Sequence, residues 1–170
     1  MSNQPKKQLT YEDYPDLPWR CPEVSMRQVL EERAEEKVRR FAGRTNTRNY
    51  AGEQPIFYEL RGQYGEWAFA DTYDLPLQPM EDEGGGYDFT LGRRHVDVKA
   101  CNMGVHHSGV WNPKPKWIYV WARVDDYNHR AALLGWLPGA RLLERPPLER
   151  GNRTYPHGFP LTDLMPMETL

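Results

Sequence analysis

The segment GGGYDFTLGRRHVDVKA, residues 84–100, constrains the fold of this chain more than any other part of the sequence. Two short runs in which apolar and polar residues alternate flank Gly92 and Arg93. Glycine at the first central position is typical of a two-residue type II′ turn, so we expect antiparallel strands over 87–91 and 95–101. Because such a turn fixes the register, each side chain of the hairpin can be assigned to a face.

The predicted register gives the hairpin one apolar face. Phe89 lies opposite Val96, and Tyr87 lies opposite Val98. Directly opposed side chains of an antiparallel pair share one face, so these four residues are assigned to the same side of the hairpin.

The other face of the hairpin carries Asp88 opposite Asp97, and His95 and Lys99 share it. Directly opposed side chains have Cβ atoms about 4.5 to 5.5 Å apart, so two carboxylates there repel each other unless a cation lies between them. Carboxylate oxygens favour Mg²⁺, with Mn²⁺ as a substitute. Such an ion polarises a phosphoryl oxygen and lowers the pKa of bound water. Lys99 can orient that water or neutralise developing charge.

The spacing of apolar residues around the hairpin predicts one α/β domain over 25–170, with a central mixed sheet flanked by helices. Residues 1–24 are polar and interrupted by prolines, which predicts an extended arm. The run WIYVWARV, 117–124, predicts a strand buried on both faces. The other predicted elements are a helix from Ser25 to a stop at Gly43, helices over 55–73 and 139–144, and a strand over 131–137.

Glu66, in the predicted second helix, is the candidate third acidic residue of the site. The small residues Gly62, Gly65 and Ala68 surround it and would let the helix approach the sheet closely. Glu66 could then contribute to the metal site directly or through water. Glu59 lies two helical turns earlier on the same face, so a second helix carboxylate in the site stays open.

These residues resemble the motif of the PD-(D/E)XK nuclease superfamily. The matching segments are GQYGEWAFA with Glu66, GGYD with Asp88, and VDVKA with Asp97, Val98 and Lys99. The spacing is similar to that of small phage and prophage members, and the likeness covers residues 59–101. Two features depart from the motif: Tyr87 stands where the superfamily's name has proline, and only eight residues lie between the two aspartates.

The resemblance implies a restriction-endonuclease-like core with the element order αβββαβ. It also implies a Mg²⁺-dependent nuclease that hydrolyses the phosphodiester bonds of nucleic acid, with DNA as the favoured substrate. The implied metal ligands are Glu66, Asp88, Asp97 and the backbone carbonyl of Val98. Lys99 would position or activate the attacking water. The alternative function is a nuclease-like scaffold without turnover that binds nucleic acid or a protein partner.

A second D/E-x-K triplet, Glu35-Glu36-Lys37, indicates that the triplet alone carries little weight. In a chain with 24 acidic residues and six lysines, about one such triplet arises by chance. We expect this one to lie on the solvated face of the first helix. A strand, an opposed aspartate and a preceding acidic helix distinguish the triplet at 97–99.

The charge balance excludes a protein that coats nucleic acid through bulk electrostatics, since 22 basic residues face 24 acidic ones and the net charge is -2. A local basic surface remains compatible with this balance. Its candidate residues are Arg44, Arg48, Arg93, Arg94, His106 and His107. The chain has no GxxxxGK loop, so we expect no nucleoside triphosphate as a partner. DNA against RNA, the strandedness of the substrate and a homodimer all stay open.

The composition also bears on location. No run of about 20 apolar residues occurs, and MSNQPKKQL at the start lacks the apolar stretch of a secretory signal. The two cysteines, Cys21 and Cys101, are too few for a disulfide framework and suit a reducing compartment. We therefore expect no membrane partner and a cytoplasmic location in a bacterial cell or a phage-infected host.

Overall fold

A four-stranded mixed sheet lies at the centre of the molecule in the computed structural model, which describes residues 17–41, 54–79, 86–150 and 153–170. The strand order is β1-β2-β4-β5. The β1–β2 and β4–β5 pairs are antiparallel, and the β2–β4 pair is parallel. The bounds are Phe89–Leu91 for β1, Arg94–Cys101 for β2, Ile118–Asp125 for β4 and Arg130–Pro138 for β5. The prediction of an α/β fold with a mixed sheet is confirmed.

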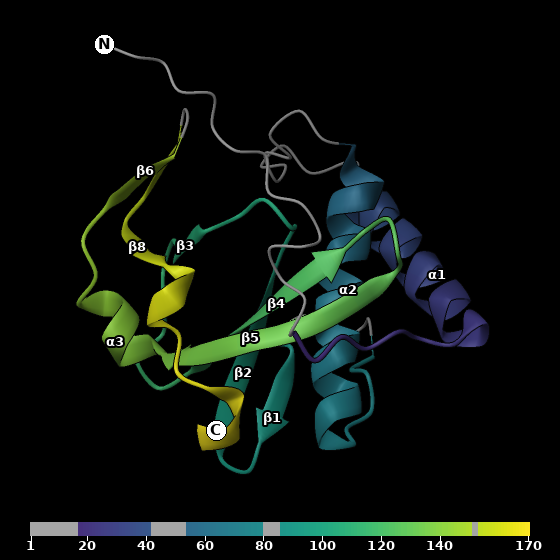
Figure 1. The fold of residues 1–170 in the computed structure, drawn as a ribbon, viewed down its shortest axis with the longest axis horizontal. Helices are drawn as coiled ribbons and strands as arrows, with labels where there is room; N and C mark the ends of the chain where they lie inside the picture. Colours follow the sequence, from purple (N-terminus) through teal and green to yellow (C-terminus); the bar gives the residue numbers. More distant parts are fainter. Residues whose placement is uncertain (1–16, 42–53, 80–85, 151–152) are drawn as a thin grey trace.

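Two long helices lie on one face of this sheet (Figure 1). α1 spans Val24–Phe41 and α2 spans Pro55–Tyr73, as the apolar spacing predicts. α2 packs on β2, β4 and β5, and α1 packs on α2. Pro55 suits the first turn of α2, where its missing N–H costs no hydrogen bond, and Asp74 ends the helix in the left-handed conformation. No described helix is long and apolar enough to cross a membrane.

A β-ribbon and a short helix cover part of the opposite face of the sheet (Figure 1). The bounds are β3 His107–Val110, α3 Gly139–Leu143, β6 Leu148–Arg150, β7 Arg153–Tyr155 and β8 His157–Pro160. β3 pairs with β8, and β6 pairs with β7, both antiparallel. The buried side chains between this layer and the sheet are Val110, Tyr119, Trp121, Leu137, Leu142 and Phe159. The sequence predicts the short helix but none of these four strands.

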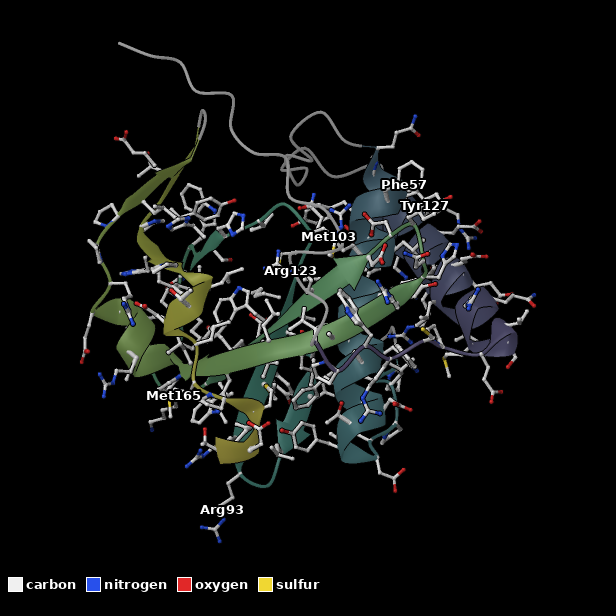
Figure 2. The ribbon with its side chains drawn as sticks, viewed as in Figure 1. Phe57, Arg93, Met103, Arg123, Tyr127 and Met165 are labelled. Atoms are coloured by element: carbon white, nitrogen blue, oxygen red, sulfur yellow. The ribbon has the colours of Figure 1, made fainter. Side chains whose placement is uncertain are left out.

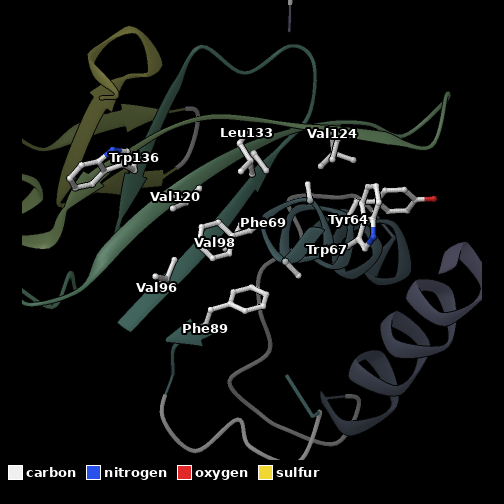
Figure 3. Close-up of a cluster of buried hydrophobic side chains, with 14 of the residues drawn as sticks. Tyr64, Trp67, Phe69, Phe89, Val96, Val98, Val120, Val124, Leu133 and Trp136 are labelled. Carbon is white, nitrogen blue, oxygen red and sulfur yellow. The ribbon is translucent and has the colours of Figure 1, made fainter. Parts of the chain in front are cut away.

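The main core fills the space between α2 and the sheet (Figure 3). Gly65 allows the close approach, because a Cβ added there would lie 3.1 Å from the Cβ of Ala100 and 3.3 Å from that of Ala122. A Cβ at Gly62 would meet nothing within 4 Å. The expected role of small residues therefore holds for Gly65 and does not hold for Gly62.

Every residue of β4 is buried, which confirms the prediction of a strand covered on both faces. Val96 and Val98 belong to the core beneath α2. Because side chains alternate along a strand, Asp97 and Lys99 lie on the opposite face of β2, the face on which the β3–β8 ribbon packs.

The outer edge of β5 is occupied by segments from both ends of the described chain. Arg20 bridges to Ala131, and Met165 bridges to Trp136. Gly135 has a φ of 153° and lies next to a β-bulge in β5, where Leu134 has no partner in the register with β4. A Cβ at Gly135 would lie 2.4 Å from the carbonyl oxygen of Met165. Glycine at 135 therefore lets the C-terminal segment lie against β5.

Candidate active site

The hairpin has the register that its turn predicts. Phe89 pairs with Val96, and Gly92 in the turn has a φ of 61°. Regular pairing stops at Phe89, so the expected strand over 87–91 is wrong at its first two residues.

Beyond the end of β1, the side chain of Asp88 accepts a hydrogen bond from β2 that a paired strand would otherwise accept. Its backbone N–H donates to the carbonyl of Val96 at 2.8 Å, and its Oδ2 accepts a hydrogen bond from the N–H of Val98 at 2.6 Å. The carboxylate therefore satisfies a backbone donor that β1 would otherwise pair.

The same hydrogen bonds orient the carbonyl of Val98, the predicted backbone ligand. The N–H and C=O of one residue in an extended strand point to the same side. Since the N–H of Val98 points toward Asp88, the carbonyl of Val98 also faces this edge of β2, beyond the end of β1.

Asp97 brings the second carboxylate to this edge. Asp97 directly precedes Val98, whose N–H binds Asp88, and the two carboxylates are close enough for their charges to interact. Burial and the charge of Asp97 raise the pKa of Asp88 to about 6. Burial likewise raises the pKa of Asp97, although its pairing with Lys99 opposes the shift. Two neighbouring carboxylates repel each other when both are ionised, so the pair favours either a shared proton or a bound cation. The sequence predicts the same repulsion.

Lys99 provides the positive charge on this face. Its Nζ lies 2.7 Å from Oδ2 of Asp97, and its side chain is 40% exposed. Burial lowers the pKa of Lys99, but the neighbouring Asp97 carboxylate outweighs burial, so the net shift is upward. Lys99 is therefore an ammonium group at neutral pH, suited to hold a water or an anion by hydrogen bonds.

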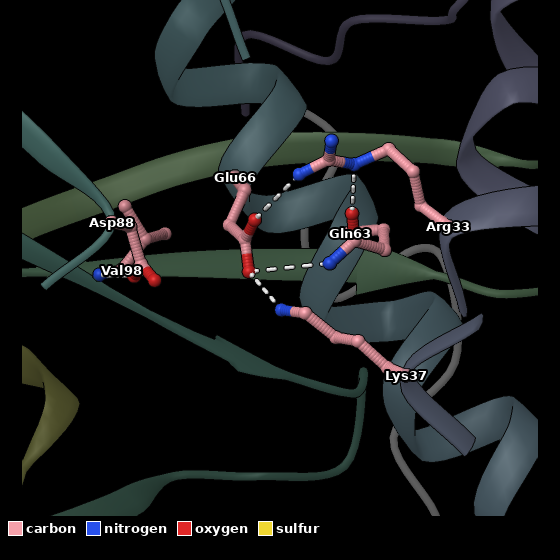
Figure 4. A network of polar contacts seen from close by, with 6 residues as sticks. All are labelled: Arg33, Lys37, Gln63, Glu66, Asp88 and Val98. Carbon is pink, nitrogen blue, oxygen red and sulfur yellow. Dashed lines mark hydrogen bonds and ion pairs between the residues drawn. The ribbon is translucent and has the colours of Figure 1, made fainter. Parts of the chain in front are cut away.

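Glu66 projects from α2, with Asp88 on one side of it and Arg33 and Lys37 of α1 on the other (Figure 4). It accepts hydrogen bonds from Nζ of Lys37 at 3.0 Å and from Nε2 of Gln63 at 3.3 Å, and Arg33 lies 3.9 Å away. Burial and the charge of Asp88 raise the pKa of Glu66 to about 7. The third predicted acid is thus close enough to Asp88 for their charges to interact.

Arg33 and Lys37 are functional candidates that the sequence reasoning missed. The expectation that Lys37 lies on a solvated surface is wrong, because its side chain is only 12% exposed. The signal was the helical spacing, since Leu30 and Ala34 are buried and share this side of α1 with both cations. The neighbouring acids Glu35 and Glu36 made this stretch of the helix look like a solvated face.

The remaining predicted residues lie farther from the acids. Glu59 is buried two turns from Glu66, about 10 Å along the helix axis. Arg93 and Arg94 are exposed at the hairpin tip, where Arg93 points away from the molecule (Figure 2). Exposed His106 and His107 lie at the start of β3. Arg44 and Arg48 lie outside the described residues.

Aromatic rings lie beside the acids on the face of β2 that the β3–β8 ribbon covers. The sequence did not predict this group of rings. Tyr87 stacks on His95 with ring centroids 4.0 Å apart, and Trp117 meets the two rings edge-on at 5.7 and 5.9 Å. Tyr119 lies beside Asp97 in the sheet, and the charge of Asp97 contributes to its raised pKa after burial.

The donor set can be tested for its fit to a metal ion. Within the described residues, no three His, Cys, Asp or Glu side chains form a metal-binding group. The arrangement at β2 instead offers two neighbouring carboxylates and the backbone carbonyl of Val98, which faces the same edge. Such an all-oxygen set fits Mg²⁺, which is commonly bound through one or two carboxylates and retains several waters.

We compared the chain with protein-family models, curated proteins and solved structures, and none of them matches it.

Proposed function

We propose that this protein is a Mg²⁺-dependent nuclease that hydrolyses phosphodiester bonds in DNA. The observation that carries the proposal is the carboxylate of Asp88 held by the N–H of Val98, the residue next to Asp97, with Nζ of Lys99 2.7 Å from Oδ2 of Asp97. Paired acids beside a lysine suit phosphodiester hydrolysis, because the acids can hold a divalent cation and the ammonium can stabilise developing negative charge.

The proposal includes a restriction-endonuclease-like core. In its support, α2 precedes the β1–β2 hairpin, and β2 pairs in parallel with β4. Among the described residues two features differ from the order αβββαβ. Two strands of the central sheet, and not three, precede the crossover from β2 to β4, and that crossover carries β3 where the order has a helix.

Each residue of the site has a role in this proposal. Asp88, Asp97 and the Val98 carbonyl would hold Mg²⁺, which supplies Lewis-acid polarisation and a more acidic bound water. Lys99 orients the attacking water or stabilises charge on the phosphoryl oxygens. Glu66 adds negative charge next to Asp88, directly or through water.

The local charge balance suits a divalent cation that binds together with an anionic substrate. Three acids, Glu66, Asp88 and Asp97, face three cations, Arg33, Lys37 and Lys99. The cluster is therefore neutral when every group is ionised. Bound Mg²⁺ would add two positive charges, and a phosphodiester with an attacking hydroxide would balance them.

A cleavage assay tests the proposal. Linear duplex, circular, branched and single-stranded DNA, with RNA in parallel, are incubated with the protein in Mg²⁺, in Mn²⁺ or in EDTA. We expect metal-dependent cleavage that falls by about 100-fold or more in Asp97→Asn and in Lys99→Met. Asp163→Asn, which removes an acid from an ion pair with Arg145 elsewhere, is the control and retains activity.

Two results count against this function. Cleavage that survives in both site variants would place the activity elsewhere or in a contaminant. Absence of cleavage from every substrate, with Mg²⁺ bound, would favour the scaffold that binds nucleic acid or a protein partner without turnover.

A further inference from the structure

The positions of the lysines bear on whether the site binds a single strand or a duplex. The described residues contain four lysines. Lys99 and Lys37 contact the acids of the site. The other two, Lys114 and Lys116, are exposed in the segment 114–116, here called the lysine loop.

The lysine loop is fixed next to the acids. The backbone N–H of Lys114 donates to the hydroxyl of Tyr119 at 2.8 Å, and Tyr119 lies beside Asp97 in the sheet. The N–H of Trp117 donates to the carbonyl of Lys114 at 3.0 Å, and a Cβ at Gly139 would lie 1.9 Å from that carbonyl oxygen. The loop is therefore seated against Gly139 and Tyr119 and presents its two charges at a defined place.

Trp117 joins the lysine loop to the rings of Tyr87 and His95, and we call these three rings the aromatic platform. All three side chains are partly exposed. The Nδ1 of His95 is buried and has no hydrogen-bond partner among the described residues. Ring packing against Tyr87 and Trp117 thus holds the imidazole, which leaves an aromatic surface on the face that also carries Asp97 and Lys99.

We propose that the aromatic platform and the lysine loop bind single-stranded DNA and direct it to the acids. This inference rests on the proposed function for its choice of nucleic acid. Aromatic rings interleaved with cations are typical of single-strand binding, because bases stack on the rings while cations follow the phosphates. A duplex hides the faces of its bases, so it would use the lysines and gain nothing from the rings. The substrate is therefore a free single strand or the unpaired strand of a branched or frayed molecule.

Equilibrium binding measured by fluorescence anisotropy tests the inference with the full chain in EDTA, where no cleavage interferes. A labelled single strand is compared with the duplex of the same sequence. We expect the single strand to bind about tenfold more tightly, as one stacked base would provide. Equal affinity, or tighter binding of the duplex, would overturn the proposal.

The double variant Lys114→Gln/Lys116→Gln tests the lysine loop without touching the core. Loss of two phosphate contacts should weaken single-strand binding about 25-fold at 0.1 M salt and make the salt slope shallower by about 1.4. The control is Arg39→Gln/Arg40→Gln on α1, which packs on the far side of α2. An unchanged slope in the lysine variant, or an equal loss in the control, would overturn the proposal.

Trp117→Leu separates stacking from charge. It should weaken single-strand binding about fivefold or more and leave the salt slope unchanged, whereas unchanged affinity would overturn the role of the platform. If this variant does not fold, the lysine variant still decides the question. Single-strand binding without any cleavage in Mg²⁺ would remove the proposed function and keep this inference, and cleavage confined to duplex DNA would do the reverse.

Discussion

Lys37 illustrates how much a single residue can depend on its tertiary surroundings. Within Glu35-Glu36-Lys37 it belongs to a strongly charged stretch, which is typical of a solvated helix face. The structure turns it toward Glu66, with 12% of each side chain exposed. Asp88 and Asp97 could be predicted because the hairpin fixes their faces, whereas the pairing of Lys37 depends on how α1 docks on α2.

We predict that Lys37→Met destabilises the protein in a pH-dependent manner. The variant leaves Arg33, 3.9 Å away, as the nearest cation to the buried, ionised Glu66, so we expect a loss of about 2 kcal/mol in unfolding free energy at pH 8. At pH 5.5 the loss should be smaller, because burial raises the pKa of Glu66 to about 7 and its neutral form needs no cation. Urea unfolding at both pH values measures the difference.

Lys37→Arg is the matched control for that experiment, since it retains the charge. Its stability should stay close to that of the wild type at both pH values. A loss in Lys37→Met that is the same at pH 5.5 and pH 8 would show that Lys37 contributes through packing alone.

At the scale of elements, the hairpin could be predicted in its register and not in its length. Alternation and the turn glycine determine which residues pair. The end of β1 depends on the carboxylate of Asp88, which binds the N–H of Val98 in place of a backbone carbonyl. Aspartate side chains compete with strand pairing in this way, and no alternation pattern reveals when they do.

Two substitutions at Asp88 should separate its structural and chemical roles. Asp88→Asn keeps an oxygen that can accept from Val98, whereas Asp88→Ala leaves that N–H unpaired. We therefore expect Asp88→Ala to be less stable than Asp88→Asn by about 1 kcal/mol in chemical denaturation. Both variants should lose metal-dependent cleavage. Equal stability of the two would mean that the hydrogen bond to Val98 contributes nothing to folding.

The contact between α2 and the sheet makes a second prediction at this scale. Gly65→Leu would force α2 away from Ala100 and Ala122 and displace Glu66, so we expect a loss of about 2 kcal/mol or more and weaker cleavage. Gly62→Leu lies on the same helix with nothing within 4 Å of the added Cβ, and it should be neutral or slightly stabilising. Thermal unfolding of both variants measures the contrast, and similar losses would argue against the close approach at Gly65.

At the scale of the whole molecule, the central sheet and its helices could be predicted and the second layer could not. The helices and core strands have strong apolar periodicity within short windows. β3 and β8 have four residues each, lie far apart in the sequence and pair with one another. Their pairing depends on long-range packing around Trp121, whose indole N–H donates to the hydroxyl of Ser108 at 2.9 Å, and local sequence does not encode that contact.

Global stability should report on the metal site through pH. In EDTA, the pKa values of Asp88 and Glu66 are raised to about 6 and about 7, so the folded state binds more protons than the unfolded state between the ordinary carboxyl pKa values and about pH 7. Their contribution to stability is therefore full at low pH and is lost as pH rises through about 6 to 7. Mg²⁺ should reverse this trend, because it binds the ionised acids.

We expect Mg²⁺ at about 100 times its Kd to raise Tm by roughly 5 to 10 °C at pH 8 and by less at pH 5, where protons compete for Asp88. Differential scanning calorimetry with Mg²⁺ and with EDTA at each pH measures the effect. Asp97→Asn should lose most of the increase. An equal increase in that variant would mean that Mg²⁺ stabilises the protein from another site.

The hydrogen bond from Val98 to Asp88 also bears on which ion the site accepts. With Oδ2 of Asp88 engaged by a backbone N–H, the carboxylate is poorly placed to grip a cation through both oxygens. Ca²⁺ takes six to eight oxygen ligands, often with bidentate carboxylates, whereas Mg²⁺ accepts single oxygens and keeps its waters. A strand-edge hydrogen bond would thus make the site selective for the smaller ion.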